Sequence, residues 1–176
     1  MEILRSHEAK QYCQKMSELC ADGKPPHFAD LDLMRIYELA PNITVLDVDH
    51  DTYRLKVRFA GTRVGAMFGR ETTGLHMDEI DLGAHKAELI AVYWLAVEQA
   101  QAQWTSANVR ILIANHHGGP QGRNFNYERL VFPMLNADGD VGNLAAILVR
   151  QGYANGMSSI EHQQFNIPKL EQYYAA

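Results

Sequence analysis

The sequence predicts an α+β fold, with a five-stranded antiparallel β-sheet that carries its helices on one face. Two short β-type segments, residues 43–48 and 53–59, are joined by an acidic turn and begin the pattern. A long helical pattern follows from Ala84 to Ala102, and three further strand patterns come after it. Runs of strands on either side of one long helix are typical of an antiparallel sheet with helices gathered on one side.

The N-terminal segment predicts an amphipathic helix that stands apart from this sheet. Its apolar residues recur at helical spacing, and charged or amide side chains take much of the opposite face. The apolar set is Ala9, Tyr12, Cys13, Met16, Leu19 and Cys20. The connector 22–26, with its Asp-Gly and Pro-Pro pairs, ends the helix and is expected to detach it from the β-rich part. We therefore expect an N-terminal helix at residues 1–22, an α+β domain at 27–153 and a C-terminal extension at 154–176.

Two shorter helices are predicted before the long one. The first runs from Phe28 to Ala40, with Asp30 as its N-cap and Pro41 as its terminator. The second occupies residues 63–68, between glycines that can form the turns at its two ends. The three later strands are predicted at 104–114, 125–135 and 144–153.

Composition and charge exclude several classes of function. A chain of 176 residues with 47% hydrophobic residues can bury the core of one domain. A net charge of −5 and scattered basic residues argue against binding to nucleic acid or to an anionic membrane. The N-terminus lacks the apolar core of a signal peptide, so we expect a cytoplasmic protein. The common hydrolase motifs are missing, and we do not expect an enzyme.

Four segments carry a resemblance to a known family. They are LAPNITVLDV at 39–48, RFAGTRVGAMFGRETTG at 58–74, YERLVFPMLNADGDV at 127–141 and LAAILV at 144–149. In these segments the chain resembles the PAS domains, and more closely a stand-alone bacterial PAS-like family whose function is largely unknown. The resemblance covers residues 28–153.

The resemblance implies a sensory or signalling module. In PAS domains the inner face of a five-stranded sheet and a central helix enclose a small-molecule pocket, and flanking helices pass the signal to a partner. Many PAS domains are joined to a kinase, a cyclase or a DNA-binding segment, and no sequence remains here to encode one. We therefore expect the output to go through protein–protein contacts. The alternative is an adaptor that has the PAS fold and binds no ligand.

The expected pocket lies between the sheet and the helices of residues 63–101. Arg63, Thr73 or Tyr127 would form its polar end. The full set of candidate lining residues is Phe59, Arg63, Met67, Thr73, Leu75, Tyr93, Val109, Ile111, Tyr127 and Phe132.

One buried ion pair is predicted beside this pocket. Side chains alternate along residues 126–132, so Glu128 and Arg129 face opposite sides of the strand. On the core face Glu128 would need a partner, because an unpaired buried carboxylate is costly. Arg63 is the candidate, and a structural ion pair is the preferred interpretation over a ligand contact.

The cofactor is left unknown. Some PAS domains bind haem through a histidine near the long helix, where this chain has His76 and His85. A histidine at a helix start is expected to be exposed, so haem is not favoured. No cysteine lies near the pocket for a flavin adduct, and non-covalent flavin stays open. The adjacent His116 and His117 point in different directions, and no metal site is predicted.

The apolar stripe of the N-terminal helix predicts a homodimer. A stripe of this size would be unusual on the surface of a monomer, and an isolated helix of this length is marginal in water. A twofold pairing of these helices is the preferred arrangement. Docking of the helix across its own sheet is the competing outcome.

Overall fold

A computed structural model describes residues 3–115, 119–153 and 159–175 of the chain. The histidines at 116 and 117 lie outside the described residues. The α-helices are α1 (His7–Leu19), α2 (Thr62–Phe68), α3 (Lys86–Gln99) and α4 (Glu171–Tyr174). The strands are β1 (Ile43–Asp49), β2 (Arg54–Ala60), β3 (Ala102–Asn115), β4 (Gly119–Leu135), β5 (Val141–Tyr153) and β6 (Ser159–Phe165). Short 3₁₀ helices are η1 (Phe28–Asp30), η2 (Ala40–Asn42), η3 (Met77–Glu79) and η4 (Ile167–Lys169).

The strands form one antiparallel sheet, which confirms the predicted α+β fold class. Their order across the sheet is β2-β1-β5-β4-β3-β6. The predicted count of five strands is one too low, because the C-terminal extension supplies β6, which pairs with β3. The side chains of β6 are mostly polar and exposed. An edge strand of this kind needs no apolar alternation, so its sequence gave little sign of it.

The predicted helix from Phe28 to Ala40 is wrong. Only η1 and η2 form at its two ends, and the residues between them make turns. The side chain of Asp32 accepts a hydrogen bond from the backbone N–H of Met34 at 2.9 Å. Short polar side chains that bond nearby backbone in this way compete with helix formation.

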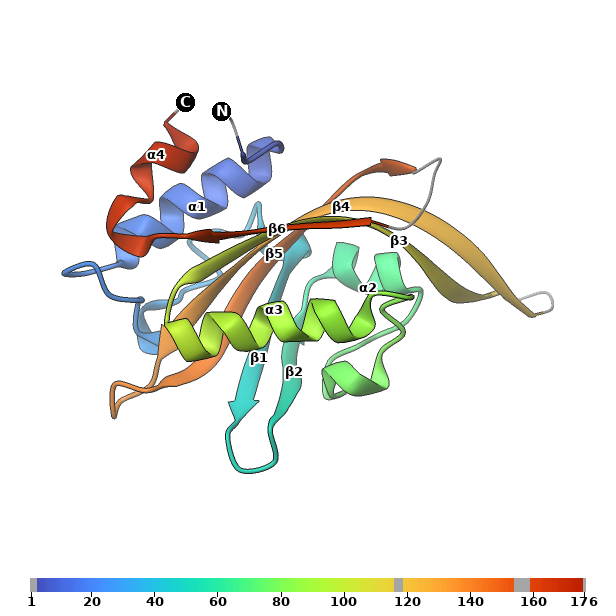
Figure 1. The fold of residues 1–176 in the computed structure, drawn as a ribbon, viewed down its shortest axis with the longest axis horizontal. Coiled ribbons are helices and arrows are strands. Elements are labelled where there is room, and N and C mark those ends of the chain that lie inside the picture. The colour runs from blue at the N-terminus through green and yellow to red at the C-terminus, as the bar shows by residue number, and fades with distance from the viewer. Residues whose placement is uncertain (1–2, 116–118, 154–158, 176) are drawn as a thin grey trace.

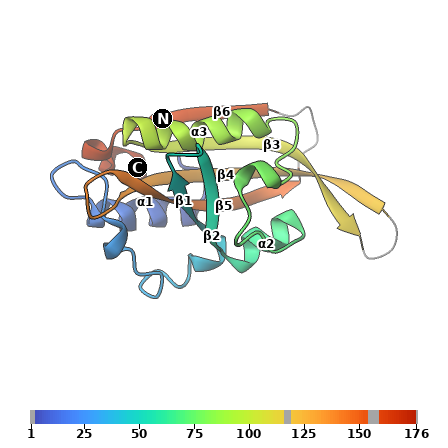
Figure 2. The same cartoon turned by 90° about the horizontal axis from the view of Figure 1, so that it is seen from below.

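The sheet has a hydrophobic core on each face, with helices on both (Figure 1). Helices α2 and α3 and the turn η3 cover the first face, and α3 extends alongside β3 and β6 (Figure 2). Helices α1 and α4 lie on the second face. The two α-helices inside the predicted domain, α2 and α3, therefore share one face of the sheet, while the two ends of the chain fold back over the second face.

Helix α1 packs on its own sheet, and its expected detachment is wrong. Tyr12, Cys13 and Met16 are completely buried in the core of the second face. The Tyr12 ring meets the Phe132 ring edge-on, with 5.8 Å between their centroids. The connector is tied to the sheet by a 2.9 Å hydrogen bond from the N–H of Leu135 to the carbonyl of Pro26. The apolar stripe that predicted a homodimer is thus already covered within one chain.

None of the helices in the described part of the chain is long and apolar enough to cross a membrane.

Replacing Met16 by Ala should lower the free energy of unfolding by about 2–5 kcal/mol, the usual cost of truncating a fully buried methionine. Because Met16 packs within its own chain, the loss should be the same at low and high protein concentration. Urea unfolding at two concentrations measures this. Gln14→Ala, at an exposed position of the same helix, is the control. A midpoint that rises with protein concentration in the wild type and not in Met16→Ala would contradict docking within one chain.

Candidate functional site

A small cavity lies on the first face, between the sheet and the elements α2, η3 and α3. Its volume is about 20 Å³, which is room for roughly one water molecule. Side chains therefore fill most of the interior in which a ligand pocket was expected. The lining residues are Thr44, Val57, Val64, Phe68, Thr72, Met77, Ile80, Leu82, Tyr93, Tyr127, Arg129 and Leu148.

Arg129 is the charged residue of this lining. It lies in the middle of β4, between Tyr127 and Val131 on the same face, and is 2% exposed. Its guanidinium carbon sits 4.2 Å from the centroid of the Tyr93 ring, which is a cation–π contact. Nη2 donates to the carbonyl of Leu89 and to Oγ1 of Thr105, each at 3.5 Å. Among the described residues, Nε has no hydrogen-bond partner.

Hydroxyl groups add polar character to the cavity, because its lining includes Thr44, Thr72, Tyr93 and Tyr127. Thr44 is buried, and among the described residues its Oγ1 has no hydrogen-bond partner. Burial raises the pKa of Tyr127 to about 12, and the nearby positive charge of Arg129 offsets only part of that rise. The Tyr127 hydroxyl therefore stays protonated at neutral pH and can donate. The cavity combines a cation, hydroxyl groups and an apolar remainder.

The neighbouring residue, Glu128, points to the opposite face and holds the start of helix α1. Its completely buried carboxylate accepts from the backbone N–H groups of Arg5 and Ser6, both at 2.8 Å. It also accepts from Oγ of Ser6 at 2.5 Å and Nε1 of Trp104 at 2.8 Å. Gln151 donates a longer bond of 3.3 Å. A carboxylate at this point also interacts favourably with the positive end of the α1 dipole.

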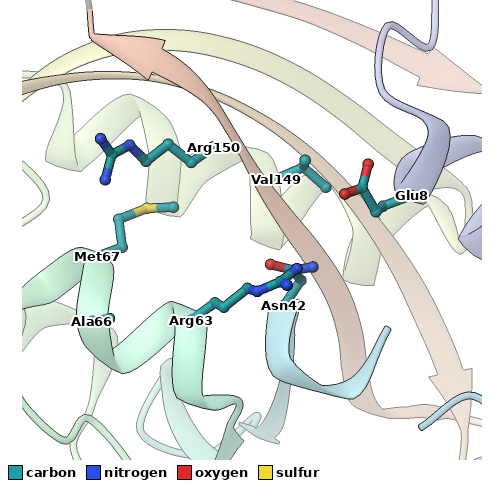
Figure 3. A pocket seen from close by; sticks show the side chains of 7 residues that line it. All are labelled: Glu8, Asn42, Arg63, Ala66, Met67, Val149 and Arg150. Atoms are coloured by element: carbon teal, nitrogen blue, oxygen red, sulfur yellow. The ribbon is translucent and has the colours of Figure 1, made fainter. Parts of the chain in front are cut away.

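An open groove of about 330 Å³ lies on the other side of α2 (Figure 3). It forms because β1 begins at Ile43, paired with Ile147, so the next residues of β5 have no strand beside them on that edge. Figure 3 shows Arg63 of α2 extending toward Asn42, with Glu8 of α1 across the groove. The buried amide nitrogen of Asn42 has no hydrogen-bond partner within the described ranges of the chain. Other lining residues are Ala66, Met67, Val149 and Arg150.

The structure brings only some of the predicted pocket residues together. Tyr93 and Tyr127 line the cavity, whereas Arg63 and Met67 line the groove. Leu75 is partly buried against the first-face core, and Thr73 is exposed. Val109 and Ile111 are buried in the first-face core, while Phe59 and Phe132 pack on the second face.

The position of Phe59 has a local cause. The register shifts between Val45 and Leu46. Val45 pairs with Phe59 and Leu46 pairs with Val57, so the residue between these two in β2 has no opposite residue in β1. Such a β-bulge changes the side chain's face within a strand. Val57 therefore faces the cavity, and Phe59 packs against the second-face core. Simple alternation cannot reveal this change.

The predicted pair between Arg63 and Glu128 is replaced by other contacts. Glu128 is satisfied by the start of α1 and by Trp104, and Arg63 lies at the groove. The alternation along β4 correctly separates residues 128 and 129, but Glu128, the candidate for the core face beside the pocket, lies on the second face, and Arg129 lines the cavity. Tyr127, two positions before Arg129, was already among the pocket candidates. That spacing was the signal that could have identified Arg129.

The cavity does not suit haem. His76 contacts Glu79 at η3, in the segment before α3. His85 contacts Glu88 at the start of α3. Neither histidine lines the cavity. A volume of about 20 Å³ is also far too small for haem or flavin without a large rearrangement.

Comparison with known proteins gives a family match. A family model described as "PAS domain" matches residues 4–149. Comparison with curated protein sequences gives no match.

Solved structures provide more distant likenesses. A structure of VqmA bound to DPO has 14% identity and a TM-score of 0.49, over 68% of this chain and 57% of that one. This chain thus spans little more than half of the VqmA chain. A LOV protein from Rhodobacter sphaeroides has 14% identity and a TM-score of 0.46, over 69% of each chain. A PAS domain from Colwellia psychrerythraea has 13% identity and a TM-score of 0.46, over 68% of this chain and 97% of that one.

Glu128→Gln should destabilise the protein by about 3 kcal/mol, because the new amide group would face the N–H donors that the carboxylate now accepts from. Urea unfolding measures the loss. Glu161→Gln is the control, since Glu161 pairs with Arg5 at 2.6 Å but is 63% exposed, and it should cost less than about 1 kcal/mol. Equal, small losses in the two variants would show that Glu128 does not hold α1.

Proposed function

Since the chain belongs to the PAS domain family, we propose that it is a sensory module that binds a small molecule between the sheet and helices α2 and α3. PAS domains are in general sensory, non-catalytic modules. The proposed output is a protein–protein contact, controlled by helix α1.

The observation that carries this proposal is the set of unpaired polar atoms in the cavity wall. Nε of Arg129 and Oγ1 of Thr44 are both buried, and neither has a hydrogen-bond partner in the part of the chain that the structure describes. Buried polar groups in folded proteins are nearly always paired, because an unpaired one costs about 1–3 kcal/mol. A bound molecule would supply the missing partners. The polar atoms therefore favour a ligand site over a purely structural core.

Helix α2 is the element whose movement would enlarge the cavity. Val64 and Phe68 of α2 line the cavity, and Met67 lines the groove on its other side. The helix has seven residues and lies between Gly61 and Gly69. Gly61 packs closely against neighbouring backbone, because a side chain there would meet the carbonyl oxygen of Ala40 at 2.2 Å, and its N–H donates to the carbonyl of Ile43 at 2.8 Å. An outward shift of α2 about this end would admit a ligand from the groove.

Strand β4 provides a route from the cavity to helix α1. Arg129 reaches into the cavity from one face, and Glu128 holds the start of α1 on the other. A displacement of β4 by a ligand would change the geometry of the bonds at Glu128. We propose that α1 then loosens and uncovers the core of the second face for a signalling partner. A homodimer through α1 would likewise require the helix to leave its own sheet.

A second candidate is a ligand-free adaptor with the same fold. The small volume of the cavity favours it, as do two large exposed side chains outside the sheet. Met34 is 79% exposed and Tyr37 is 64% exposed, on the segment between η1 and η2. Exposed apolar side chains of this size are suited to contact with a partner.

Filling the cavity should separate the two candidates. Val64→Phe adds bulk to the cavity wall, and Thr62→Phe adds the same ring to an exposed position of the same helix that lines neither the cavity nor the groove. For a sensor, native mass spectrometry of the purified protein should show a bound small molecule in the wild type and in Thr62→Phe. The molecule should be lost from Val64→Phe, and circular dichroism should confirm that both variants fold. A ligand retained in Val64→Phe would contradict the cavity as its site, and wild-type protein without any bound molecule would favour the adaptor.

A further inference from the structure

The unpaired charge in the cavity points to the chemical class of the ligand. Resting on the sensory function proposed above, we infer that the ligand is a small carboxylate, which Arg129 binds through the edge of its guanidinium group.

The first argument is the burial of a charge without a counter-ion. Arginine stays protonated in proteins, and Arg129 is 2% exposed. Its contacts are the two long hydrogen bonds and the Tyr93 ring, and within the described residues it has no ion pair. The neighbouring carboxylate, Glu128, faces the other side of the sheet and is occupied by its own donors. A buried charge is costly unless it is paired, so the cavity favours an anion.

The second argument is the geometry of the guanidinium group. Nε and Nη2 share one edge of this group, and a carboxylate can accept from both at once. Among the described residues Nε has no acceptor. Both hydrogen bonds of Nη2 are 3.5 Å long, which is longer than an ordinary N–H···O bond. The Tyr93 ring holds the guanidinium at 4.2 Å from its centroid, and it offers no lone pair to that edge. The edge that binds carboxylates best is thus the least satisfied part of Arg129.

The remaining wall defines the rest of the ligand. Thr44, Thr72, Tyr93 and Tyr127 add hydroxyl groups beside the cation. The other lining residues are apolar, and the cavity is small. A carboxylate with a short apolar body fits this arrangement, whereas a highly charged or sugar-like molecule would leave its polar groups unpaired. The apolar lining residues are Val57, Val64, Phe68, Met77, Ile80, Leu82 and Leu148.

The experiment compares carboxylates with their neutral amides at constant ionic strength. Propionate, butyrate and benzoate are titrated against the full chain beside propionamide, butyramide and benzamide, by calorimetry and by thermal unfolding. We expect the carboxylates to bind and to raise the unfolding temperature. The amides should bind at least about tenfold more weakly, which is the contribution expected of hydrogen bonds to a charged group.

Two variants of Arg129 and one control complete the test. Arg129→Met removes the buried charge, so it should abolish carboxylate binding and raise the unfolding temperature of the ligand-free protein. Arg129→Lys keeps the charge but loses the bidentate edge, so it should bind carboxylates at least about tenfold more weakly than the wild type. This variant tests the inference independently of whether Arg129→Met folds. Arg58→Met, at an exposed ion pair with Asp47, should bind carboxylates as the wild type does.

The outcomes separate this inference from the proposed function. Amides that bind as tightly as carboxylates, with Arg129→Met binding both, would overturn the carboxylate and leave the ligand cavity in place. Failure of every probe to bind, together with a lower unfolding temperature for Arg129→Met, would overturn the carboxylate and remove the support for a ligand cavity. Arg129 would then be a structural residue held by the Tyr93 ring.

Discussion

The buried carboxylate of Glu128 is the interaction on which the arrangement of the second face depends. It lies in the middle of the sheet and accepts hydrogen bonds from the backbone at the start of α1 and from Trp104. These bonds satisfy a charge that could not otherwise be buried. They also fix where α1 begins, and this position lets the apolar stripe of the helix cover the second core. Helix α4 then packs beside α1 on the same face (Figure 1).

The contrast between Glu128 and Arg129 distinguishes the two faces of the sheet. Both residues are buried and charged, and they are consecutive in β4, so they face opposite sides of the sheet. Glu128 has a full set of donors, whereas Nε of Arg129 has no acceptor. A satisfied charge stabilises a structure, and an unsatisfied one weakens it until a partner arrives. Proteins commonly accept such a local loss of stability at a binding site.

Much of the fold was predictable because it depends on local patterns. The order of the first five strands and the long helix follow from the alternation and helical periodicity of their apolar residues. The sixth strand was missed because an exposed edge strand needs no such pattern. The surface on which α1 docks could not be predicted from the sequence either. An apolar stripe shows that a helix packs against something, but it does not identify the surface. That choice is made by Glu128, more than a hundred residues away in the sequence.

The candidate site was less predictable than the fold, for reasons of geometry. Alternation along β4 separates residues 128 and 129 but does not say which one faces α3. Phe59 was misplaced because the β-bulge opposite Val45 changes its face. Arg63 and Met67 are sequence neighbours of α2 residues that line the cavity. Their own side chains line the groove on the other side of the helix (Figure 3). Only Tyr93 and Tyr127 of the predicted set line the cavity itself.

The proposed coupling between the cavity and α1 can be tested most directly at the thiol of Cys13. This side chain lies on the buried face of α1, in the second-face core, and burial raises its pKa to about 12. A thiol reagent therefore meets a reactive form only when the helix opens. The labelling rate should be measured in a Cys20→Ser background, with and without benzoate at a concentration that occupies the cavity. We expect benzoate to accelerate the labelling of Cys13 several-fold. An unchanged rate, with benzoate shown to be bound, would contradict the coupling through β4.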